Sequence, residues 1–545
     1  MRPRALIAAV VLALFAGACS VTSSVATERA DRIGAGLPAD QSADQTDPSA
    51  PPASSAPVEE PATPDDEPTS APTTDVVEPD ATAPATTEAP SEPPTTGPPT
   101  ASVPQLETDP TLIDFGQGTP PLAWDDFLLA VMTDLEAWWS VEYPAIYGEP
   151  HRSLDGGVFA AHPQRIDPIP GCGEPETSYD DVQQFVAFYC GAGDFVVYDS
   201  GPDSLLTELA GEFGPSTIGI VLAHEYGHAI QLRSGALNRA LATIRTEQQA
   251  DCFAGAWSGR AFRGEATTLV FSDADVRAGL VAMTRVADPV GLNQLSNGGH
   301  GSAFDRVGAF QVGFLEGPAR CAEILDAPLP LVPNEFRSFD DLETGGNAPL
   351  GFEDGELLAF LPADLNLYWD VQLDSQIFGF DGLTLEAASV EDEIDCLAPS
   401  GDFGRGAVLC RQTSTVWLNL PLAEQRFNQL GDFAVGYVLG VAWAEAVQQA
   451  LGSELTGESR ELANDCLAGA WVQTVIPVDG GGLPQPRPEE RVASVSPGDL
   501  DEAIQTVLLI GDLGAEENVV GSAFEKIDAF RTGVLDGLDS CLARL

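Results

Sequence analysis

Two histidines and a glutamate stand at a spacing that could hold a metal ion and hydrolyse a bond. His224-Glu225-Tyr226-Gly227-His228 follows the pattern H-E-x-x-H, in a chain that has five histidines altogether. On a helix, residues four apart share a face, so both imidazoles would point the same way, one turn apart. Such a pair is typical of ligands to one Zn²⁺, with the glutamate beside them as general base. The alternative, two core histidines with satisfied hydrogen bonds, would bury costly polar groups.

A third protein ligand is expected, because catalytic zinc usually takes three and leaves one position open. Ser234 stands where the longer H-E-x-x-H-x-x-G-x-x-H pattern places a histidine, which excludes that class. Glu247 is the next candidate, 19 residues after His228 (247 − 228), and Asp251 lies one turn further on the same helix face. We expect Glu247 to bind the metal and Asp251 to orient a ligand histidine.

His300 is a candidate for stabilising a reaction intermediate. It lies in the loop Gly-Gly-His-Gly-Ser, just before a helix expected from about Ser302. A histidine there could donate a hydrogen bond to an oxyanion; a loop residue without a special role is the alternative. Tyr226 is a further candidate for this role, although its position favours a core aromatic.

The motifs also carry a resemblance. HEYGH followed by EQQADCFAGAW resembles the bacterial "putative neutral zinc metallopeptidase" family, a gluzincin-like group. Further similar segments, within about residues 170 to 321, are Gly171-Cys172-Gly173, FYC ending at Cys190, Val197-Tyr198-Asp199 and His300-Gly301-Ser302. The resemblance implies a zinc-dependent peptidase in which His224, His228 and Glu247 bind zinc and Glu225 is the catalytic base.

The elements that position these residues are expected to be mostly helices with some short strands, an α+β fold class. TIGIVLAHEYGHAIQL is apolar with polar residues at helical spacing, which indicates a buried helix. FVAFYC and DFVVYD indicate short strands. Helices are expected at 123–140, 203–213, 216–232, 237–262, 273–288 and 303–316.

Later in the chain, segments similar to those around the metal motif recur without the H-E-x-x-H residues. GIVLAHEYGHAIQ from Gly219 aligns with GYVLGVAWAEAVQ from Gly436, and EQQADCFAGAW aligns with ELANDCLAGAW from Glu461. GSAFDRVGAF aligns with GSAFEKIDAF, and DLEAWW aligns more weakly with DLNLYW. The period is too long for a solenoid, so two tandem zincin-like domains of one fold are expected.

The second copy has lost the residues that would do chemistry. The two histidines, the glutamate and His300 are replaced by Val441, Glu445, Ala442 and Val520, in that order. A zinc site cannot survive these exchanges, so this copy is expected to be inactive, to bind substrate or regulate, and to pack on the first. Glu461 and Asp465 persist, which leaves open a structural use for E-x-x-x-D. A carboxylate site for a harder ion, completed by Glu445, is another alternative.

The repeat sorts eight of the nine cysteines into two sets of four. Pairing within each domain is expected, as Cys172–Cys190, Cys252–Cys321, Cys396–Cys410 and Cys466–Cys541. Reduced or metal-binding thiols are the alternative, but the chain contains no C-x-x-C. Four disulfides imply an oxidising, extracytoplasmic compartment.

Cys19 is the cysteine left over, and its position suggests an anchor. A basic start and the apolar run 5–18, too short to span a bilayer, end directly before it. This resembles a bacterial lipoprotein signal, which implies cleavage after Ala18 and lipid on Cys19 at the cell membrane. Ordinary secretion after cleavage near Ala18 is the alternative.

Four segments are therefore expected. Residues 1–18 form the signal peptide, and 19–112, rich in Pro, Thr, Ala, Ser and acidic residues, form a disordered tether. Residues 113–328 form the metallopeptidase-like domain, and 329–545 form the degenerate copy.

The net charge of the chain limits the classes of binding partner that are expected. The formal net charge is −58, from 25 basic and 83 acidic residues, and Lys526 is the only lysine. Without a basic stripe, nucleic acid is not expected as a partner. The leading hypothesis is a lipid-anchored extracytoplasmic zinc peptidase acting on a peptide or protein. The alternative is a non-catalytic envelope binding or scaffold lipoprotein with structural or vestigial zinc.

Overall fold

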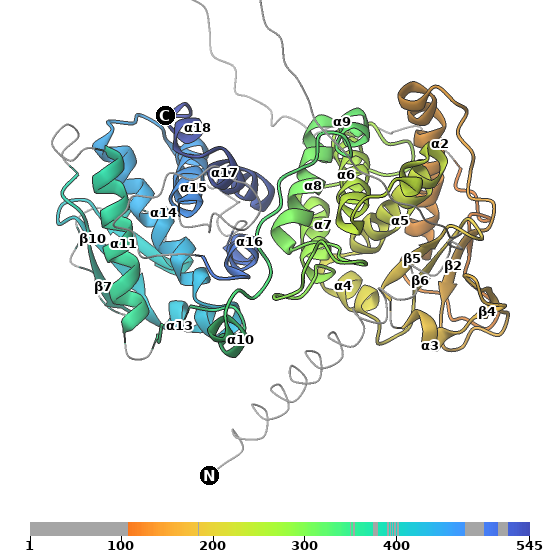
Figure 1. Cartoon of the computed structure of the whole chain (residues 1–545), viewed down its shortest axis with the longest axis horizontal. Coiled ribbons are helices and arrows are strands. Elements are labelled where there is room, and N and C mark those ends of the chain that lie inside the picture. Colours follow the sequence, from red (N-terminus) through yellow and green to blue (C-terminus); the bar gives the residue numbers. More distant parts are fainter. Residues whose placement is uncertain are drawn as a thin grey trace, which may run out of the picture. The chain divides into compact units, whose positions relative to one another are not determined.

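The computed structural model describes residues 107–545, except 184, 349, 353–354, 374–379, 390–391, 393, 395, 397–398, 401–402, 475–494 and 511–521. The described part is rich in helices and contains small sheets, which agrees with the α+β class expected from the sequence (Figure 1). The signal peptide, Cys19, nearly all of the tether and Val520 lie outside the described residues.

The first half of the described chain contains a four-stranded sheet in the order β1-β2-β6-β5. Its strands are β1 (Ile113–Asp114), β2 (Gly157–Ala161), β5 (Ala187–Cys190) and β6 (Phe195–Asp199). β2 runs parallel to β1 and β6, and β5 is antiparallel to β6. A separate antiparallel pair joins β3 (Ile169–Pro170) to β4 (Glu176–Thr177). Every residue of β6 is buried, which explains its continuous apolar run.

Helices make up most of the first half. Serine caps begin several of them, and Ser272 with Asp275 forms a capping box at the start of α7. α5 ends at Ser234 and is followed by the capping residue Gly235, whose φ of 78° suits glycine. The helices are α2 (Asp125–Tyr147), α3 (Tyr179–Val182), α4 (Leu205–Phe213), α5 (Ser216–Ser234), η2 (Ala236–Asn238), α6 (Thr243–Phe262), α7 (Asp273–Arg285), α8 (Ala303–Glu316) and α9 (Pro318–Glu323).

All six helices expected in the first half and both expected strands are present, and three helix boundaries need correction. The helix expected at 237–262 begins only at Thr243, because a short 3-10 turn, η2, precedes it. The helix expected to end at 140 continues to Tyr147, with Pro144 inside its last turn. The helix expected to reach 288 ends at Arg285.

Glycines bring α6 and α8 close together. A Cβ on Gly255 would meet the backbone oxygen of Phe310 at 1.9 Å, and one on Gly313 would meet that of Cys252 at 1.8 Å. Gly469 and Gly533 make the same kind of approach between two helices of the second half, at 2.1 and 1.9 Å. Any larger residue at these positions would force the two helices apart.

The second half contains a similar sheet in the order β7-β10-β9-β8. β10 (Thr415–Asn419) is parallel to β7 (Thr384–Ala388) and antiparallel to β9 (Ala407–Cys410), which pairs with β8 (Pro399–Ser400). Its helices are α10 (Phe339–Thr344), α11 (Glu356–Leu373), η3 (Phe403–Arg405), α13 (Leu420–Gln429), α14 (Phe433–Ala450), α15 (Gly457–Gln473), α16 (Asp499–Ile510), α17 (Ala523–Asp536) and α18 (Leu538–Leu542).

One buried hydrogen bond occurs at the same place in both halves. Trp257 Nε1 donates to Asp134 Oδ2 at 2.9 Å, and Trp471 Nε1 donates to Asp364 Oδ2 at 2.8 Å. These residues are aligned pairs of the sequence repeat, including the weakest aligned segment. A buried indole N–H needs such a partner, so these carboxylates have a structural use.

The four disulfides expected from the repeat are present. Cys252–Cys321 joins α6 to α9, and Cys466–Cys541 joins α15 to α18. Cys172–Cys190 and Cys396–Cys410 each tie a loop to the antiparallel strand of a sheet. In the described part of the chain, no helix combines the length and hydrophobicity needed to cross a membrane.

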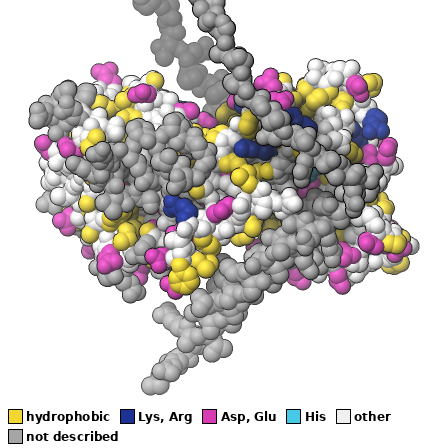
Figure 2. All heavy atoms as spheres, viewed as in Figure 1, with side chains coloured by type: hydrophobic (Ala, Val, Ile, Leu, Met, Phe, Trp, Pro, Cys, Tyr) yellow, Lys and Arg dark blue, Asp and Glu magenta, His cyan; other side chains and the backbone are white. Residues whose placement is uncertain are grey.

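The surface is acidic. Figure 2 shows Asp and Glu side chains scattered over the visible face, with Lys and Arg at only a few places. The strong negative net charge is therefore carried partly by the folded region as well as by the residues before it.

Candidate metal centre

The metal motif lies where α5 and α6 pack against each other. His224 and His228 are one turn apart on α5, with ring centroids separated by 4.8 Å and ring planes at 90°. Glu247 enters from α6: its Oε2 is 3.3 Å from His224 Nε2, and its Oε1 is 3.5 Å from His228 Nε2. Gly227 allows this approach, because a Cβ there would lie 3.1 Å from Ala250 Cα. The three side chains form one group whose ligand atoms all lie within 4.8 Å of one another.

Each imidazole is oriented through its other nitrogen. His224 Nδ1 lies 2.7 Å from Asp251 Oδ1, and His228 Nδ1 lies 2.9 Å from Gln231 Oε1. Gln231 is itself fixed, since its amide donates to the carbonyl oxygen of Thr246 at 2.6 Å. Both Nε2 atoms therefore remain for a shared ligand on the Glu247 side, the arrangement found around protein-bound zinc.

Asp251 is held in turn by an arginine. Arg306 Nε donates to its Oδ2 at 2.9 Å and Arg306 Nη2 donates to its Oδ1 at 2.7 Å, while Nη1 donates to the carbonyl oxygen of Val286. Asp251 is fully buried and Arg306 nearly so. A bidentate pair of this kind fixes the carboxylate in the plane that His224 needs.

The residues fit a divalent cation. Two neutral imidazoles and one carboxylate are a ligand set that zinc favours. Among the described residues, no group donates a hydrogen bond to the buried Glu247 Oε2, whose neighbour His224 Nε2 lies 3.3 Å away, and a cation between them would satisfy both atoms. Among the described residues, no fourth His, Cys, Asp or Glu joins the three.

Neighbouring acidic side chains shift the pKa values of the two histidines in this group. Burial alone would lower the pKa of His224, but Asp251 and Glu247 raise it to about 10. The pKa of His228 is also raised, against the effect of burial, by Glu247. Burial would raise the pKa of Glu247, yet the charges of His228 and His300 hold it well below its usual range. A cation bound by these imidazoles would compete with protons for the same nitrogens.

Glu225 lies beside the ligands without being tied down. It is 7 % exposed, and its charge acts on both His224 and His228. The described residues give it no hydrogen bond and no ion pair, unlike Glu247 and Asp251. A carboxylate left free next to a metal position can accept a proton.

His300 approaches the group from the loop before α8. Its backbone N–H donates to Asp288 Oδ2 at 2.7 Å, and its Nδ1 lies 3.2 Å from Asp288 Oδ1. A positive charge on His300 would lower the pKa of Glu247, so the loop lies within electrostatic reach of the metal group. Tyr226, the other oxyanion candidate, is fully buried with its hydroxyl 2.9 Å from His151 Nε2, as expected of a core aromatic.

The second half fills the corresponding place with charged side chains. Glu445, aligned with His228, pairs with Arg411 and lies 3.4 Å from Arg460 Nε. Arg460 Nη2 also lies 3.1 Å from Glu461 Oε1. In the first half, Gly191 and Thr246 occupy the aligned positions of the two arginines.

Asp465 is satisfied without any histidine. Lys526 Nζ lies 2.6 Å from Asp465 Oδ2, and the hydroxyl of Tyr437 donates to Oδ1 at 2.5 Å. Lys526 aligns with Arg306, so a cation fixes this aspartate in both halves. The carboxylate site for a harder ion, considered for Glu445, Glu461 and Asp465, is thus replaced by ion pairs.

Sequence reasoning missed three residues that support the site. Gln231 and Arg306 could have been found from the sequence, because the second copy of the repeat has Gln448 and a basic residue at the aligned positions. Gln448 also repeats the hydrogen bond of Gln231, donating to the carbonyl oxygen of Arg460 at 2.8 Å. Asp288 had no signal, because it is placed by the loop rather than by a motif.

Comparison with known proteins agrees with the geometry. The family model described as "Putative neutral zinc metallopeptidase" matches residues 180–324. An uncharacterized protein of Mycobacterium tuberculosis is 29% identical over 221 residues, covering 37% of this chain and 70% of the relative. The uncharacterized protein YpfJ of Escherichia coli is 31% identical over 157 residues, covering 25% of this chain and 52% of the relative. No solved structure matches.

Proposed function

We propose that the first half is a zinc-dependent peptidase that hydrolyses peptide bonds in a peptide or protein substrate. One observation carries this proposal: both imidazoles are oriented through Nδ1, so that their Nε2 atoms converge on the Glu247 carboxylate. A pair of buried structural histidines would not need three oriented groups around one unsatisfied oxygen. The family match over residues 180–324 supports the same conclusion.

Each residue of the site has a separate task. His224, His228 and Glu247 would hold Zn²⁺, and Asp251 and Gln231 would keep the two rings in register. Bound there, zinc would supply a Lewis acid that polarises a carbonyl and makes water more acidic. Glu225, free of other partners, would accept the proton of the attacking water and pass it to the leaving amine.

His300 would act on the developing negative charge. Asp288 would accept from its Nδ1–H, so that in the doubly protonated imidazolium form its Nε2–H would donate a hydrogen bond to an oxyanion. The side chains of His228 and His300 retain 15% and 13% exposure, whereas that of Glu247 retains 7%. Substrate would therefore approach from the side of His228 and His300.

The second half is proposed to be a tandem copy of the first that has lost catalysis. Support comes from the aligned sheets, the repeated Trp–Asp hydrogen bond and the equivalent disulfides. Its proposed role is to bind substrate or to regulate, packed on the first half. Contacts between α16 and α8 support the packing: the N–H groups of Ala303 and Phe304 donate to Asp501.

The site would work outside the cytoplasm, tethered to the membrane. The disulfides support an oxidising compartment, and the proposed lipid on Cys19 with the tether up to residue 112 would anchor the folded region. Radiolabelled fatty acid incorporation into the wild type, compared with Cys19→Ser, tests the anchor independently of the peptidase activity.

The decisive experiment compares Glu225→Gln with the wild type in metal analysis and peptide-library cleavage. We expect both to bind one zinc and the variant to lose hydrolysis by about 10²–10⁴-fold, the usual contribution of a general base. Glu461→Gln in the second half is the matched control and should change neither zinc content nor cleavage. Equal cleavage by wild type and Glu225→Gln would show that the base is misassigned. Zinc binding without cleavage by either would favour a scaffold protein with structural zinc.

A further inference from the structure

A second cluster of possible metal ligands lies apart from the zinc group, in the second half. Asp432 stands directly before α14, and Asp499 and Glu502 lie in the first turn of α16. Each offers a carboxylate oxygen, and these oxygens all lie within 4.8 Å of one another. The three residues are 5%, 3% and 7% exposed. Three acids gathered in a buried place need either protons or a cation.

Two oxygens of this cluster lack a hydrogen-bond donor among the residues that the structure describes. They are the buried atoms Asp432 Oδ1 and Asp499 Oδ1. The other oxygens of these two residues are satisfied, by the N–H groups of Ala348 and Ser496. Buried acceptors without donors are rare in folded proteins, so two within one cluster point to a missing positive partner.

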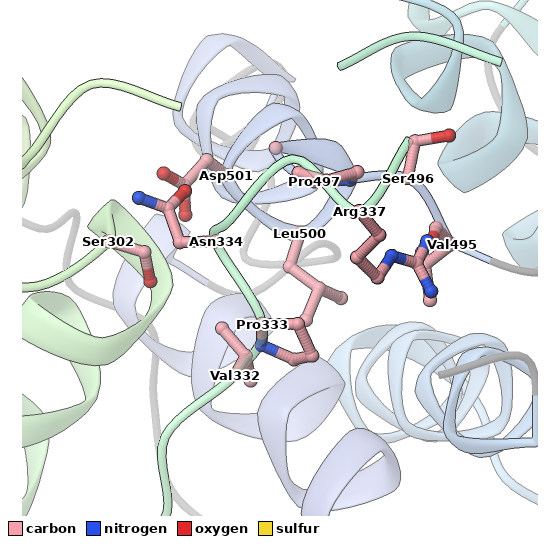
Figure 3. Close-up of a pocket in the computed structure, with 11 residues that line it drawn as sticks. Ser302, Val332, Pro333, Asn334, Arg337, Val495, Ser496, Pro497, Leu500 and Asp501 are labelled. Carbon is pink, nitrogen blue, oxygen red and sulfur yellow. The ribbon is translucent and has the colours of Figure 1, made fainter. Parts of the chain in front are cut away.

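Protein cations do not supply that partner. In the described part of the chain, no ion pair joins Lys, Arg or His to Asp432, Asp499 or Glu502, whereas Glu445 and Asp465 each have one. Arg337 acts on Asp499 by its charge, but its Nη2 donates to the carbonyl oxygen of Val495 at 2.8 Å. Figure 3 shows this side chain reaching toward Val495 along a hollow that Asp501 and Asn334 also line.

Backbone geometry holds the third acid in place. Glu502 Oε2 accepts the N–H of Phe433 at 2.8 Å, at the amino end of the 18-residue helix α14. Gly431 has a φ of 131°, and a Cβ there would lie 2.0 Å from Glu502 Oε1. The carboxylate is thus packed against the chain beside Asp432. Burial raises the pKa of Asp432 to about 6, and burial with mutual repulsion raises those of Asp499 and Glu502 well above their usual range.

The cluster belongs to the second half alone. Ser496 and Asp499 at the start of α16 repeat the Ser272–Asp275 capping hydrogen bond at the start of α7. By that register Glu502 corresponds to Ala278, and by the repeat Asp432 corresponds to Pro215. The half that lacks zinc ligands therefore carries an acidic triad that the other half lacks.

We infer that Asp432, Asp499 and Glu502 form a binding site for a hard divalent cation of the Ca²⁺ or Mg²⁺ class. All of the offered ligands are oxygens, which these ions prefer and which zinc with its nitrogen and sulfur preference does not. Three carboxylates offset the charge of such an ion, and the two unpartnered oxygens give it ligands. The inferred site is structural: it would join the start of α14 to the start of α16.

The test uses the full chain loaded with zinc, from which excess zinc has been removed. Ca²⁺, Mg²⁺ and Mn²⁺ are titrated separately by calorimetry, and the thermal midpoint is followed at each concentration. We expect one further ion per chain at millimolar concentration or below, with a midpoint that rises with cation concentration because only the folded chain has the site. Mn²⁺ would in addition give a bound spectrum in electron paramagnetic resonance.

Asp499→Asn and Glu502→Gln, each checked for folding by circular dichroism, should abolish that binding and the cation-dependent rise. Asp275→Asn, which alters the corresponding cap in the first half, is the matched control and should keep both. Absence of binding at millimolar Ca²⁺, Mg²⁺ and Mn²⁺ would overturn the inference, and so would cation binding that survives in both variants. The former result would mean that the acids share protons instead. Zinc content and peptide cleavage do not enter this test, so it stands or falls apart from the proposed peptidase activity.

Discussion

The two halves differ at the buried position that Glu247 occupies in the first half and Glu461 in the second. Around Glu247, two imidazoles leave a place for a metal ion; around Glu461, arginines and a glutamate fill it with ion pairs. Both halves share the residues that support this position. In each, a glutamine donates to the carbonyl oxygen of the residue before the glutamate. In each, a basic side chain also pairs with the buried aspartate. The comparison teaches that E-x-x-x-D persists in a half that lacks the two histidines, so that only H-E-x-x-H separates the two sites.

The largest expected effect comes from making the first half like the second. His224→Val, Glu225→Ala and His228→Glu together should remove zinc and lower peptide cleavage by more than about 10³-fold, since both metal and base are lost. Gly191→Arg and Thr246→Arg supply the cations that accompany Glu445 in the second half. The five-residue variant should therefore be more stable than the three-residue variant, as measured by urea unfolding. Zinc content near one per chain in either would refute the ligand assignment.

A smaller effect separates the two buried aspartates. Asp251→Asn should weaken zinc binding by about 10- to 100-fold, the usual effect of losing the group that orients a ligand histidine. Asp465→Asn should leave zinc affinity unchanged. Both should destabilise the fold by about 3–5 kcal/mol, because each leaves a buried cation, Arg306 or Lys526, without its partner. Competition with a chelator measures the first property and urea unfolding the second; equal zinc affinities would contradict the assignment.

A pH effect of similar or lesser size is expected from Asp305. Burial raises its pKa to about 7, above the ordinary value of 3.8. The folded state then binds a proton that the unfolded state releases, so this contribution to stability is full below about pH 4 and is lost as pH rises to about 7. Asp305→Asn should reduce the loss of unfolding free energy between low and high pH by at most about 4 kcal/mol, at 1.36 kcal/mol per pKa unit. Urea unfolding at pH 5 and pH 8 measures it, with Glu525→Gln at the exposed aligned position as control.

The smallest effect is expected at Glu445. Arg411 and Arg460, its partners, are 37% and 26% exposed in their side chains, so the pairs are screened by water. Glu445→Gln should change the free energy of unfolding by about 1 kcal/mol or less, and less at high salt. Zinc content and cleavage should not change. A large loss of stability would show that these pairs carry more of the second half than their exposure implies.

Much of the site could be predicted because its signal is local. Helical spacing places His224 and His228 on one face. The repeat draws attention to Glu247 and Asp251, because both residue types recur at the aligned positions of the second copy. The same logic predicted all four disulfides. Contacts set by loops had no such signal: Asp288 reaches His300 only because the chain turns back there, and α6 starts late because η2 interrupts the helical pattern.

The acidic triad shows the other limit of sequence reasoning. Asp432 and Glu502 are far apart in sequence and belong to no motif, so only the packing of α14 against α16 brings them together. The sequence also does not predict that these carboxylates are buried. In an acidic chain, no pattern distinguishes these carboxylates from those that simply face water.

The close glycine contacts between α6 and α8, and between α15 and α17, have a consequence for genome surveys. Gly255 and Gly469 each sit inside the stretch that reads A-G-A-W, and both are required by backbone spacing whether or not a metal binds nearby. Selection for folding alone would preserve that stretch. A survey for metal sites that scores this stretch would also count copies without the two histidines, whereas a survey that scores the histidines would not.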